Sequence, residues 1–323
     1  MRNIKRLVVL VMIAGLLLAL AGCSNTSPNA TSSKKTIKIA YLPITHAVPL
    51  FVEKENLSQN VSGLEDVNVE LVKFGTWNEL IDALNTGKVD GASVLIELAM
   101  KAKEQGIDLK VVGLGHRDGN NVTVANSINT PADLKGKTVA VPQRFSTQNI
   151  LLYKMLQDAN VAYADVTVIE LPPSEMPAAL AEGRIAAYIV AEPFGSKAVT
   201  LGKGKVLYES KDLWVDSVCC GLVFRGDFIK NNKEIAQKIV KRYVDAGKQA
   251  ESKDEHIQEV TAKYLSVDKA TLASSLKYTS YVNLSLEKKD YEQLSQYLIA
   301  MGLLKNPPAY NDFVENSLIN KAE

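Results

Sequence analysis

A group of polar side chains stands where a short apolar strand gives way to a helix. Within Val139–Leu156, the residues Arg144, Ser146, Thr147 and Gln148 all lie in or beside a turn between two apolar segments. Ser146 is a preferred N-cap residue, and a helix N-terminus presents free backbone N–H groups and the positive end of the helix dipole. The pattern predicts an anion site, in which the Arg144 guanidinium can bind a sulfonate or carboxylate through two parallel hydrogen bonds. The alternative is a capped helix with a solvated arginine.

Cysteine and histidine supply little for metal or covalent chemistry. The chain of 323 residues has three of each and contains neither Cys-x-x-Cys nor His-Glu-x-x-His. A disulfide between the adjacent Cys219 and Cys220 would be strained, so we interpret both as small buried apolar side chains. His46, His116 and His256 form no recognisable Ser/His/Asp motif. We therefore expect no catalytic residues, no metal and no cofactor.

The N-terminus has the pattern of an exported lipoprotein. A basic start and an apolar run, Leu7–Leu20, suit a signal peptide, and the run is too short to span a membrane comfortably. The tetrapeptide that ends in Cys23 resembles a bacterial lipobox, whose cysteine is acylated. We predict a lipoprotein signal peptide over residues 1–23, lipidation at Cys23, and a flexible tether over residues 24–35. An uncleaved anchor is the alternative.

The rest of the chain alternates strands with helices, which indicates an α/β protein. A net charge of +1 makes nucleic acid an unsuitable partner. Strands are predicted at Thr36–Pro43, Val67–Phe74, Val89–Val94, Leu109–Leu114, Thr138–Val141 and Val166–Leu171. Helices are predicted at residues 48–55, 77–84 and 97–103, from Ser146 onward, and at residues 234–250, 257–265, 268–278 and 286–301. We expect the last four helices to pack on the first lobe.

An internal repeat divides the chain into two similar lobes. Three patterns of residue types occur twice, in the same order and about 100 residues apart. The first copies are Thr36-Ile-Lys-Ile, Val67–Leu71 and Ala83-Leu-Asn-Thr-Gly-Lys-Val. Two α/β lobes form a cleft, and the loops after the strand ends face it. The candidate ligand residues are therefore Thr45, His46, Phe74 to Trp77, Arg144 to Gln148, Pro172 to Glu175, and Glu192 to Phe194. His116–Asn121 lies between the lobes as a hinge, a ligand contact or both.

Several separated motifs give a family resemblance. They are Ile39-Ala-Tyr-Leu-Pro-Ile-Thr-His, Gly87-Lys-Val-Asp-Gly-Ala, Gly183-Arg-Ile-Ala-Ala-Tyr-Ile-Val-Ala-Glu-Pro-Phe and Cys219-Cys-Gly-Leu-Val-Phe-Arg. Together they resemble substrate-binding proteins of the nitrate/sulfonate/bicarbonate class (taurine-like, NMT1/THI5-like) of ABC importers. The resemblance implies a type II periplasmic-binding-protein fold of two α/β lobes with a ligand cleft between them. Lobe 1 would be discontinuous, with residues 36–122 and 222–323, and lobe 2 would comprise residues 123–221.

The resemblance also implies binding residues. Nitrate-binding relatives use an aromatic–Gly–Thr run, an interlobe amide and a polar run at a helix start. The matching positions here are Phe74 and Thr76 with Trp77 nearby, then Asn120, and then Ser146, Thr147 and Gln148. Where those relatives place a lysine against the anion, this chain has Cys220, which disfavours nitrate and bicarbonate. Trp77 could instead pack in the core, and Glu192 could hold backbone amides of lobe 2.

The predicted function is capture of a small solute by hinge closure, for delivery to an ABC permease and ATPase. The protein would be a monomer outside the cytoplasmic membrane, anchored through Cys23, and its ligand an oxyanion of the sulfonate, nitrate or bicarbonate type. Arg144→Ala would then weaken binding by roughly 2–4 kcal/mol. Three alternatives stay open: a neutral heterocycle such as a thiamine pyrimidine, an enzyme on the same fold, and a lipoprotein that feeds a sensor kinase.

Overall fold

The computed structural model describes residues 34–58 and 64–320. The chain divides into one unit over Met1–Lys35 and a second, compact unit over Thr36–Glu323. The predicted signal peptide with Cys23, and the predicted tether up to residue 33, lie outside the described residues. Within the described part of the chain, no helix combines the length and the apolar character needed to cross a bilayer.

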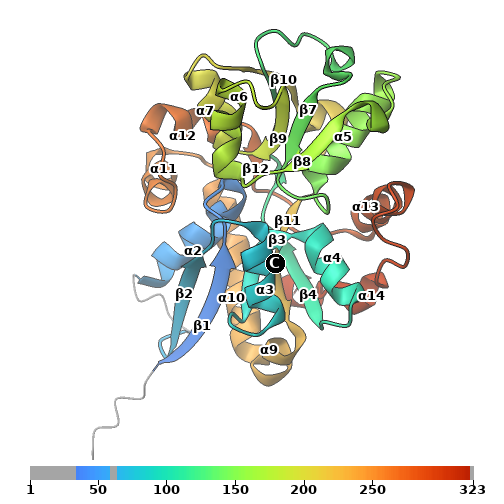
Figure 1. Ribbon diagram of the computed structural model, residues 1–323. Coiled ribbons are helices and arrows are strands. Elements are labelled where there is room, and N and C mark those ends of the chain that lie inside the picture. The colour runs from blue at the N-terminus through green and yellow to red at the C-terminus, as the bar shows by residue number, and fades with distance from the viewer. Residues whose placement is uncertain (1–33, 59–63, 321–323) are drawn as a thin grey trace, which may run out of the picture. The chain divides into compact units, whose positions relative to one another are not determined.

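Two five-stranded sheets form the second unit, one in each lobe (Figure 1). The first sheet has the order β2–β1–β3–β11–β4, with β1 (Lys35–Tyr41), β2 (Val67–Lys73), β3 (Gly91–Leu95), β4 (Leu109–Leu114) and β11 (Cys220–Arg225). The second has the order β10–β6–β9–β7–β8, with β6 (Asn120–Val124), β7 (Thr138–Val141), β8 (Thr167–Glu170), β9 (Ala187–Ala191) and β10 (Lys205–Glu209). Two α/β lobes, as predicted, are therefore confirmed.

The two sheets have the same topology, which confirms the internal repeat. Read from the opposite edge, β8–β7–β9–β6–β10 matches β2–β1–β3–β11–β4 strand for strand. In both sheets the first strand of the repeat runs parallel to the third, as β1 does to β3 and β7 to β9. The fourth position is antiparallel in both, with β11 against β3 and β6 against β9.

Each antiparallel strand follows a connection between the lobes. β6 is the first strand of the second sheet after the chain leaves β4, and β11 is the first strand of the first sheet after the chain leaves β10. The chain thus changes sheet between Leu114 and Asn120 and returns between Glu209 and Cys220. The predicted lobe boundaries at 122/123 and 221/222 fall inside β6 and β11, because each connecting segment becomes a strand of the sheet that it enters.

Helices cover both faces of the sheets, with short 3-10 helices in several loops. Those of the repeats are α2 (Val48–Ser58), α3 (Trp77–Asn85), α4 (Ile96–Glu104), α5 (Thr147–Asp158), α6 (Met176–Ala181), α7 (Phe194–Thr200) and α8 (Ser210–Leu213). The 3-10 helices are η1 (Thr45–Ala47), η2 (Pro131–Leu134), η3 (Tyr163–Asp165) and η4 (Pro173–Glu175). The predicted strand at 89–94 is displaced to Gly91–Leu95. Its first residue must be glycine, because a Cβ at Gly91 would lie 2.2 Å from the Phe224 ring.

The C-terminal segment is helical, as predicted. It comprises α9 (Gly226–Asn231), α10 (Lys233–Ala250), α11 (Glu255–Ala262), α12 (Lys269–Leu276), α13 (Lys288–Ala300), α14 (Tyr310–Phe313) and α15 (Ser317–Asn320). α10 and α11 pack on α2 of the first lobe, in line with the expectation. α12 instead contacts α7 of the second lobe, so this segment touches both lobes.

The first connection between the lobes is held by a buried arginine. Arg117 starts the two-residue strand β5 (Arg117–Asp118), which pairs with β12 (Thr279–Ser280). Its guanidinium donates to the carbonyl oxygens of Asn283 (3.0 Å) and Asp216 (3.0 Å), and it forms a 2.9 Å ion pair with Asp290. The connection is thereby fixed to the C-terminal segment.

Candidate functional site

The ends of the strands in the two lobes face each other, and loops from both lobes meet there. Thr45, in η1 after β1, donates its backbone N–H to the Glu192 carbonyl oxygen at the end of β9 (2.8 Å). Gln143, after β7, donates its side-chain amide to the Asn78 side-chain oxygen in α3 (2.8 Å). These hydrogen bonds join one lobe to the other, so the lobes are in contact in this structure.

The N-terminus of α5 lies in this contact, and its polar side chains bind protein groups. Ser146 caps the helix by accepting the Asn149 N–H (3.1 Å), as predicted. The Thr147 hydroxyl hydrogen-bonds the Glu97 carboxyl group and donates to the Val218 carbonyl oxygen (2.7 Å). The side chains of Ser146, Thr147 and Glu97 are all buried.

An amide pair continues the contact. Gln148 donates to the Asn120 side-chain oxygen (2.7 Å) and lies 3.6 Å from the Cys219 sulfur. Both amides are buried, and each keeps one polar atom without a partner among the described residues, Oε1 of Gln148 and Nδ2 of Asn120. The structure thus brings Asn120 into contact with Gln148, which follows Ser146 and Thr147 at the start of α5, whereas Thr45 contacts Glu192 instead.

Glu192 takes a structural position. Its carboxylate accepts hydrogen bonds from the Asn121 side-chain amide and from the Ser196 backbone N–H of α7 (3.1 Å). Burial raises the pKa of Glu192, although the hydrogen bonds from Ser196 and Asn121 oppose this shift. The interpretation that Glu192 holds a backbone amide of lobe 2 therefore agrees with its contacts.

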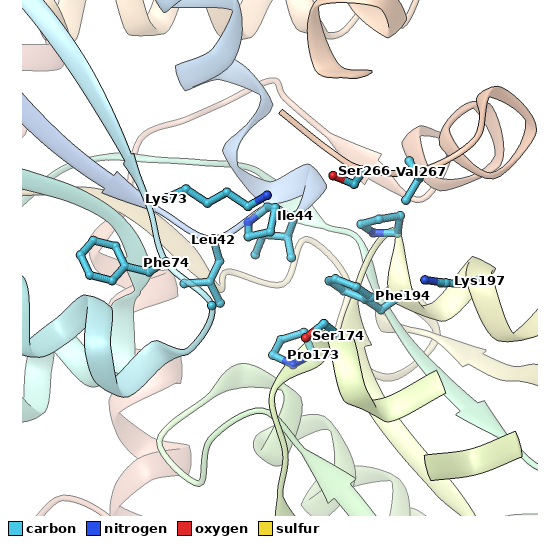
Figure 2. A pocket seen from close by; sticks show the side chains of 13 residues that line it. Leu42, Ile44, Lys73, Phe74, Pro173, Ser174, Phe194, Lys197, Ser266 and Val267 are labelled. Atoms are coloured by element: carbon cyan, nitrogen blue, oxygen red, sulfur yellow. The ribbon is translucent and has the colours of Figure 1, made fainter. Parts of the chain in front are cut away.

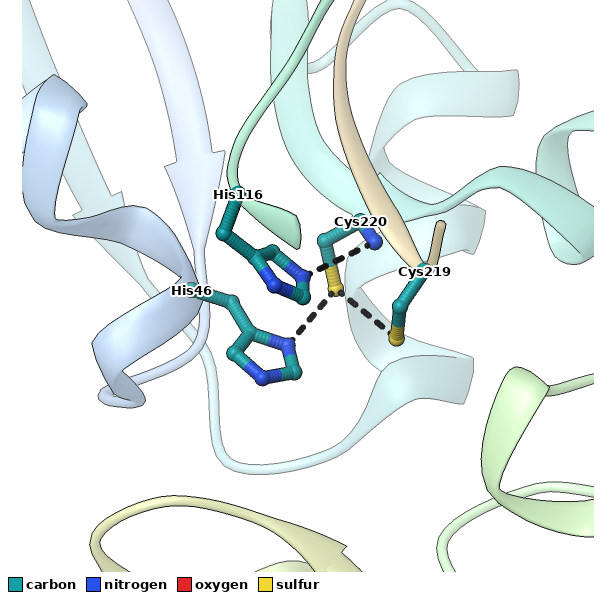
Figure 3. A group of neighbouring side chains, drawn as sticks. All are labelled: His46, His116, Cys219 and Cys220. Atoms are coloured by element: carbon teal, nitrogen blue, oxygen red, sulfur yellow. Dashed lines mark hydrogen bonds between the residues drawn. The ribbon is translucent and has the colours of Figure 1, made fainter. Parts of the chain in front are cut away.

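Two histidines and two cysteines form a buried cluster beneath the amide pair. His46 from η1, His116 from the end of β4, and Cys219 and Cys220 at the start of β11 lie with their potential ligand atoms within 4.8 Å of one another (Figure 3). The two sulfurs are 3.8 Å apart, and the His46 Nδ1 is 3.5 Å from the Cys220 sulfur. We call these four residues the His/Cys cluster.

Hydrogen bonds set the state of the two imidazoles. His46 Nε2 lies 3.1 Å from the Gly119 carbonyl oxygen, so this nitrogen donates to it, and Nδ1 faces the Cys220 sulfur. His116 Nε2 accepts the Cys220 backbone N–H (3.2 Å). Burial, together with the nearby His46, lowers the pKa of His116 to about 4, so this ring is neutral at neutral pH. The two rings stack with centroids 3.4 Å apart.

A cavity of about 400 Å³ opens beside these buried contacts, between the lobes. Lobe 1 contributes Leu42, Ile44 and Lys73, and lobe 2 contributes Pro173, Phe194 and Lys197, as Figure 2 shows. The wall is mainly apolar, and the two lysines approach it from opposite lobes. Within the described residues neither lysine forms an ion pair. The remaining lining residues are Pro43, Phe74, Gly75, Ser174, Pro193, Ser266 and Val267.

The other predicted site residues lie apart. Phe74 lines this cavity, whereas Thr76 and Trp77 line a second, smaller one of about 220 Å³. Trp77 is only 3% exposed and belongs to the core. Arg144 is exposed, donates to the Val168 carbonyl oxygen (2.9 Å) and lines neither cavity. A ligand contact by Arg144 stays a prediction that this geometry does not support.

Sequence reasoning missed three groups. Lys73 directly precedes the predicted Phe74, and Lys197 lies one helical turn beyond Phe194. The rule that ligand residues lie in the loops after strand ends could therefore have indicated both. Ser266 and Val267 come from the C-terminal helical segment, for which no cleft position was expected. The His/Cys cluster has no sequence motif, because its members come from three loops.

The fold and the interlobe cavity define a class of protein: two-lobed solute-binding proteins with the type II periplasmic-binding-protein fold. The NMT1-like family model matches residues 30–266, most of the described chain, and the protein belongs to this family.

Known proteins of similar sequence or structure carry related descriptions. The putative aliphatic sulfonates-binding protein of Bacillus subtilis is 25% identical, over 97% of this chain and 96% of its own length. A crystal structure of the ligand-binding component of an ABC-type import system from Staphylococcus aureus, with zinc bound, is 37% identical, with a TM-score of 0.85, and covers 90% of this chain and 99% of its own. The match to the Synechocystis nitrate import ATP-binding protein NrtC covers 56% of this chain but only 30% of that protein.

Proposed function

We propose that this protein is the solute-binding component of an ABC importer, and that it captures an organic oxyanion of the sulfonate type. The observation that carries the proposal is the interlobe cavity, where two lysines without ion-pair partners among the described residues border a mainly apolar wall. The names of the Bacillus subtilis relative and the Staphylococcus aureus structure support the same class. The permease and ATPase partners, and the lipid anchor at Cys23, are part of this proposal.

The shape and chemistry of the cavity favour an amphipathic anion. Leu42, Ile44 and Phe194 offer apolar surface for an alkyl or aryl group. Lys73 and Lys197 can each donate a charge-assisted hydrogen bond to sulfonate oxygens from opposite sides. Nitrate and bicarbonate have no apolar part to use this wall, and a neutral heterocycle would leave both cations without a counter-charge.

Capture would proceed by closure. The cavity takes its walls from both lobes, and a ligand that touches both lobes stabilises the closed arrangement over an open one. The Thr45–Glu192 and Gln143–Asn78 hydrogen bonds add contacts that exist only when the lobes meet. The closed form would be the one that the permease recognises.

Calorimetry with a series of alkanesulfonates tests the anion site. We expect affinity to rise with alkyl length, by at most about 0.8 kcal/mol for each buried methylene, until the apolar wall is covered. Lys73→Met and Lys197→Met should each weaken a sulfonate about tenfold, or ~1.4 kcal/mol, because one charge-assisted hydrogen bond is lost while most of the unbranched apolar side chain is kept.

Two controls make the test specific. Lys203→Met removes an exposed lysine of lobe 2 that does not line the cavity, and it should leave affinity unchanged. An alkyl sulfone of matched length lacks the charge and should bind at least tenfold more weakly than the sulfonate. Equal affinity for sulfone and sulfonate would contradict the proposal, and tight binding of a thiamine pyrimidine alone would favour the neutral-ligand alternative.

A further inference from the structure

The His/Cys cluster contains the side chains that a borderline-soft metal ion prefers. Thiolate sulfur and imidazole nitrogen bind zinc well, whereas magnesium and calcium prefer oxygen ligands. The cluster holds two of the three histidines and two of the three cysteines of the chain. Such residues rarely gather by chance in a chain with so few of them.

The spacing within the cluster agrees with tetrahedral coordination. Zn–S and Zn–N bonds of about 2.3 and 2.05 Å at tetrahedral angles place two sulfurs about 3.8 Å apart, and a sulfur and a nitrogen about 3.5 Å apart. The distance between the Cys219 and Cys220 sulfurs is 3.8 Å, and that from His46 Nδ1 to the Cys220 sulfur is 3.5 Å. Two edges of the tetrahedron are therefore present in the structure.

The backbone and the hydrogen bonds prepare the ligands. Side chains alternate along a strand, but Cys219 lies just before β11 begins, so its sulfur can point to the same place as that of Cys220. The Gly119 carbonyl oxygen accepts a hydrogen bond from His46 Nε2, so Nδ1 faces the sulfurs. Metal-binding histidines usually make such a hydrogen bond with the ring nitrogen that does not bind the metal. His116 Nε2 is unprotonated, since it accepts the Cys220 N–H, and its lone pair can pass to a metal instead.

Unpartnered polar atoms around the cluster are an independent indication of a ligand. Glu97 Oε2, Asn120 Nδ2 and Gln148 Oε1 are buried and have no hydrogen-bond partner among the described residues. Gln148 contacts the Cys219 sulfur, and burial together with the nearby Cys219 raises the pKa of Glu97. Buried polar groups are rarely left without a partner, and a bound ion with its surroundings is one common reason.

We propose that His46, His116, Cys219 and Cys220 form a buried zinc site at the base of the interlobe contact. When Zn²⁺ binds, each thiol forms a Zn–S bond and releases its proton to solvent. The two thiolates then balance the charge of the ion, so no net charge is buried. None of the four residues lines the sulfonate cavity, so the inference does not depend on the proposed anion.

The position of the site links metal entry to lobe movement. All four side chains are fully buried, and Gln148 and Asn120 of lobe 2 cover them. Zinc therefore enters and leaves when the lobes separate. The bound ion would tie η1 of lobe 1 to both connections between the lobes, because His116 lies in the first connection and Cys219 and Cys220 lie at the end of the second.

Cobalt and zinc titrations of the full chain, reduced and freed of metal in a non-chelating detergent, test the site. We expect one equivalent of Co²⁺ to give tetrahedral d–d bands and a thiolate charge-transfer band, and one equivalent of Zn²⁺ to displace it. Cys219→Ser and Cys220→Ser should each weaken Zn²⁺ at least a hundredfold and reduce the charge-transfer band. His46→Gln should weaken Zn²⁺ but keep that band.

Matched controls separate the cluster from other ligands. His256→Gln changes the exposed third histidine, and Cys23→Ser changes the third cysteine, which lies outside the described residues. Both should bind Zn²⁺ as the unchanged protein does, and so should Lys73→Met. Zinc binding that is unaffected by Cys219→Ser and Cys220→Ser would overturn the proposal.

A measurement on the unchanged protein decides the matter if the variants fail to fold. X-ray absorption at the zinc edge should show two sulfur neighbours at about 2.3 Å and nitrogen neighbours at about 2.0–2.1 Å. A first shell of nitrogen and oxygen alone would overturn the proposal.

Discussion

At the scale of single residues, the position of Arg144 differs most from what its sequence neighbourhood suggests. An arginine beside a helix start is suited to bind an anion, yet its guanidinium donates to the carbonyl oxygen of Val168 in β8 (2.9 Å) and is exposed to solvent. Its backbone N–H also lies against the Glu170 carboxyl group (2.6 Å). A nearby carboxylate makes this point less suitable for an anion.

Arg144→Ala should therefore leave sulfonate affinity within about threefold of the unchanged protein, well below the tenfold change that equals 1.4 kcal/mol. Calorimetry beside Lys73→Met gives the comparison on one scale. A loss of a hundredfold or more in Arg144→Ala would return the anion to the helix start and contradict the cavity site.

At the scale of elements, the start of α5 combines a local N-cap with hydrogen bonds to distant parts of the chain. Ser146 caps the helix through the Asn149 N–H, as its sequence position predicts. The Ser146 hydroxyl also donates to the Gln143 carbonyl oxygen (2.5 Å). Thr147 hydrogen-bonds Glu97 in α4 of lobe 1 and Val218 in the second connection between the lobes. The helix start is therefore a contact between lobes, and its hydroxyls are occupied by protein groups.

Ser146→Ala should lower the free energy of unfolding by about 1 kcal/mol, as expected for loss of an N-cap. Urea denaturation followed by circular dichroism measures this, with the exposed Ser127→Ala as the matched control. Sulfonate affinity should stay unchanged. If stability is kept and affinity falls, the hydroxyl binds ligand and the structural role assigned here is wrong.

At the scale of the whole molecule, the two lobes are copies of one topology that exchange their fourth strands. β6 follows lobe 1 in the chain but belongs to the second sheet, and β11 follows lobe 2 but belongs to the first. Each connection is thus anchored by a full strand at one end, and Arg117 fixes the first one at its middle. The proposed closure would therefore bend the short segments between those anchors.

Sulfonate should contract the molecule in solution. Small-angle scattering on residues 36–323, without the N-terminal segment, should give a radius of gyration of about 19 Å, as expected for a compact chain of that length, when a saturating sulfonate is present. Without ligand the value should be larger, because the interlobe hydrogen bonds alone do not hold all molecules closed. The Lys73→Met, Lys197→Met double variant should not contract at the same sulfonate concentration. Identical scattering curves with and without ligand in the unchanged protein would argue against closure.

Much of the fold could be predicted from local patterns. Alternating strands and helices, the Ser146 cap and the repeat of Thr36-Ile-Lys-Ile at Thr138 depend on residues close together in the chain, and the structure contains them within a few residues of the predicted bounds. Strand ends also indicated the loops around Thr45, Phe74, Pro173 and Glu192, because strand ends in an α/β sheet lie at one edge.

Only the tertiary structure decided which of those loops meet and what they bind. His46, His116 and Cys219–Cys220 are far apart in the chain and come together because the ends of β1 and β4 and the start of β11 lie at the same edge of the first sheet. Lys73 and Lys197 face one cavity because the lobes close on each other, and Arg144 turns away because β8 offers it a carbonyl oxygen. Residue type and spacing along a chain specify strands and helices, whereas contacts between strand ends depend on the order of strands in the sheets and on the packing of one lobe against the other.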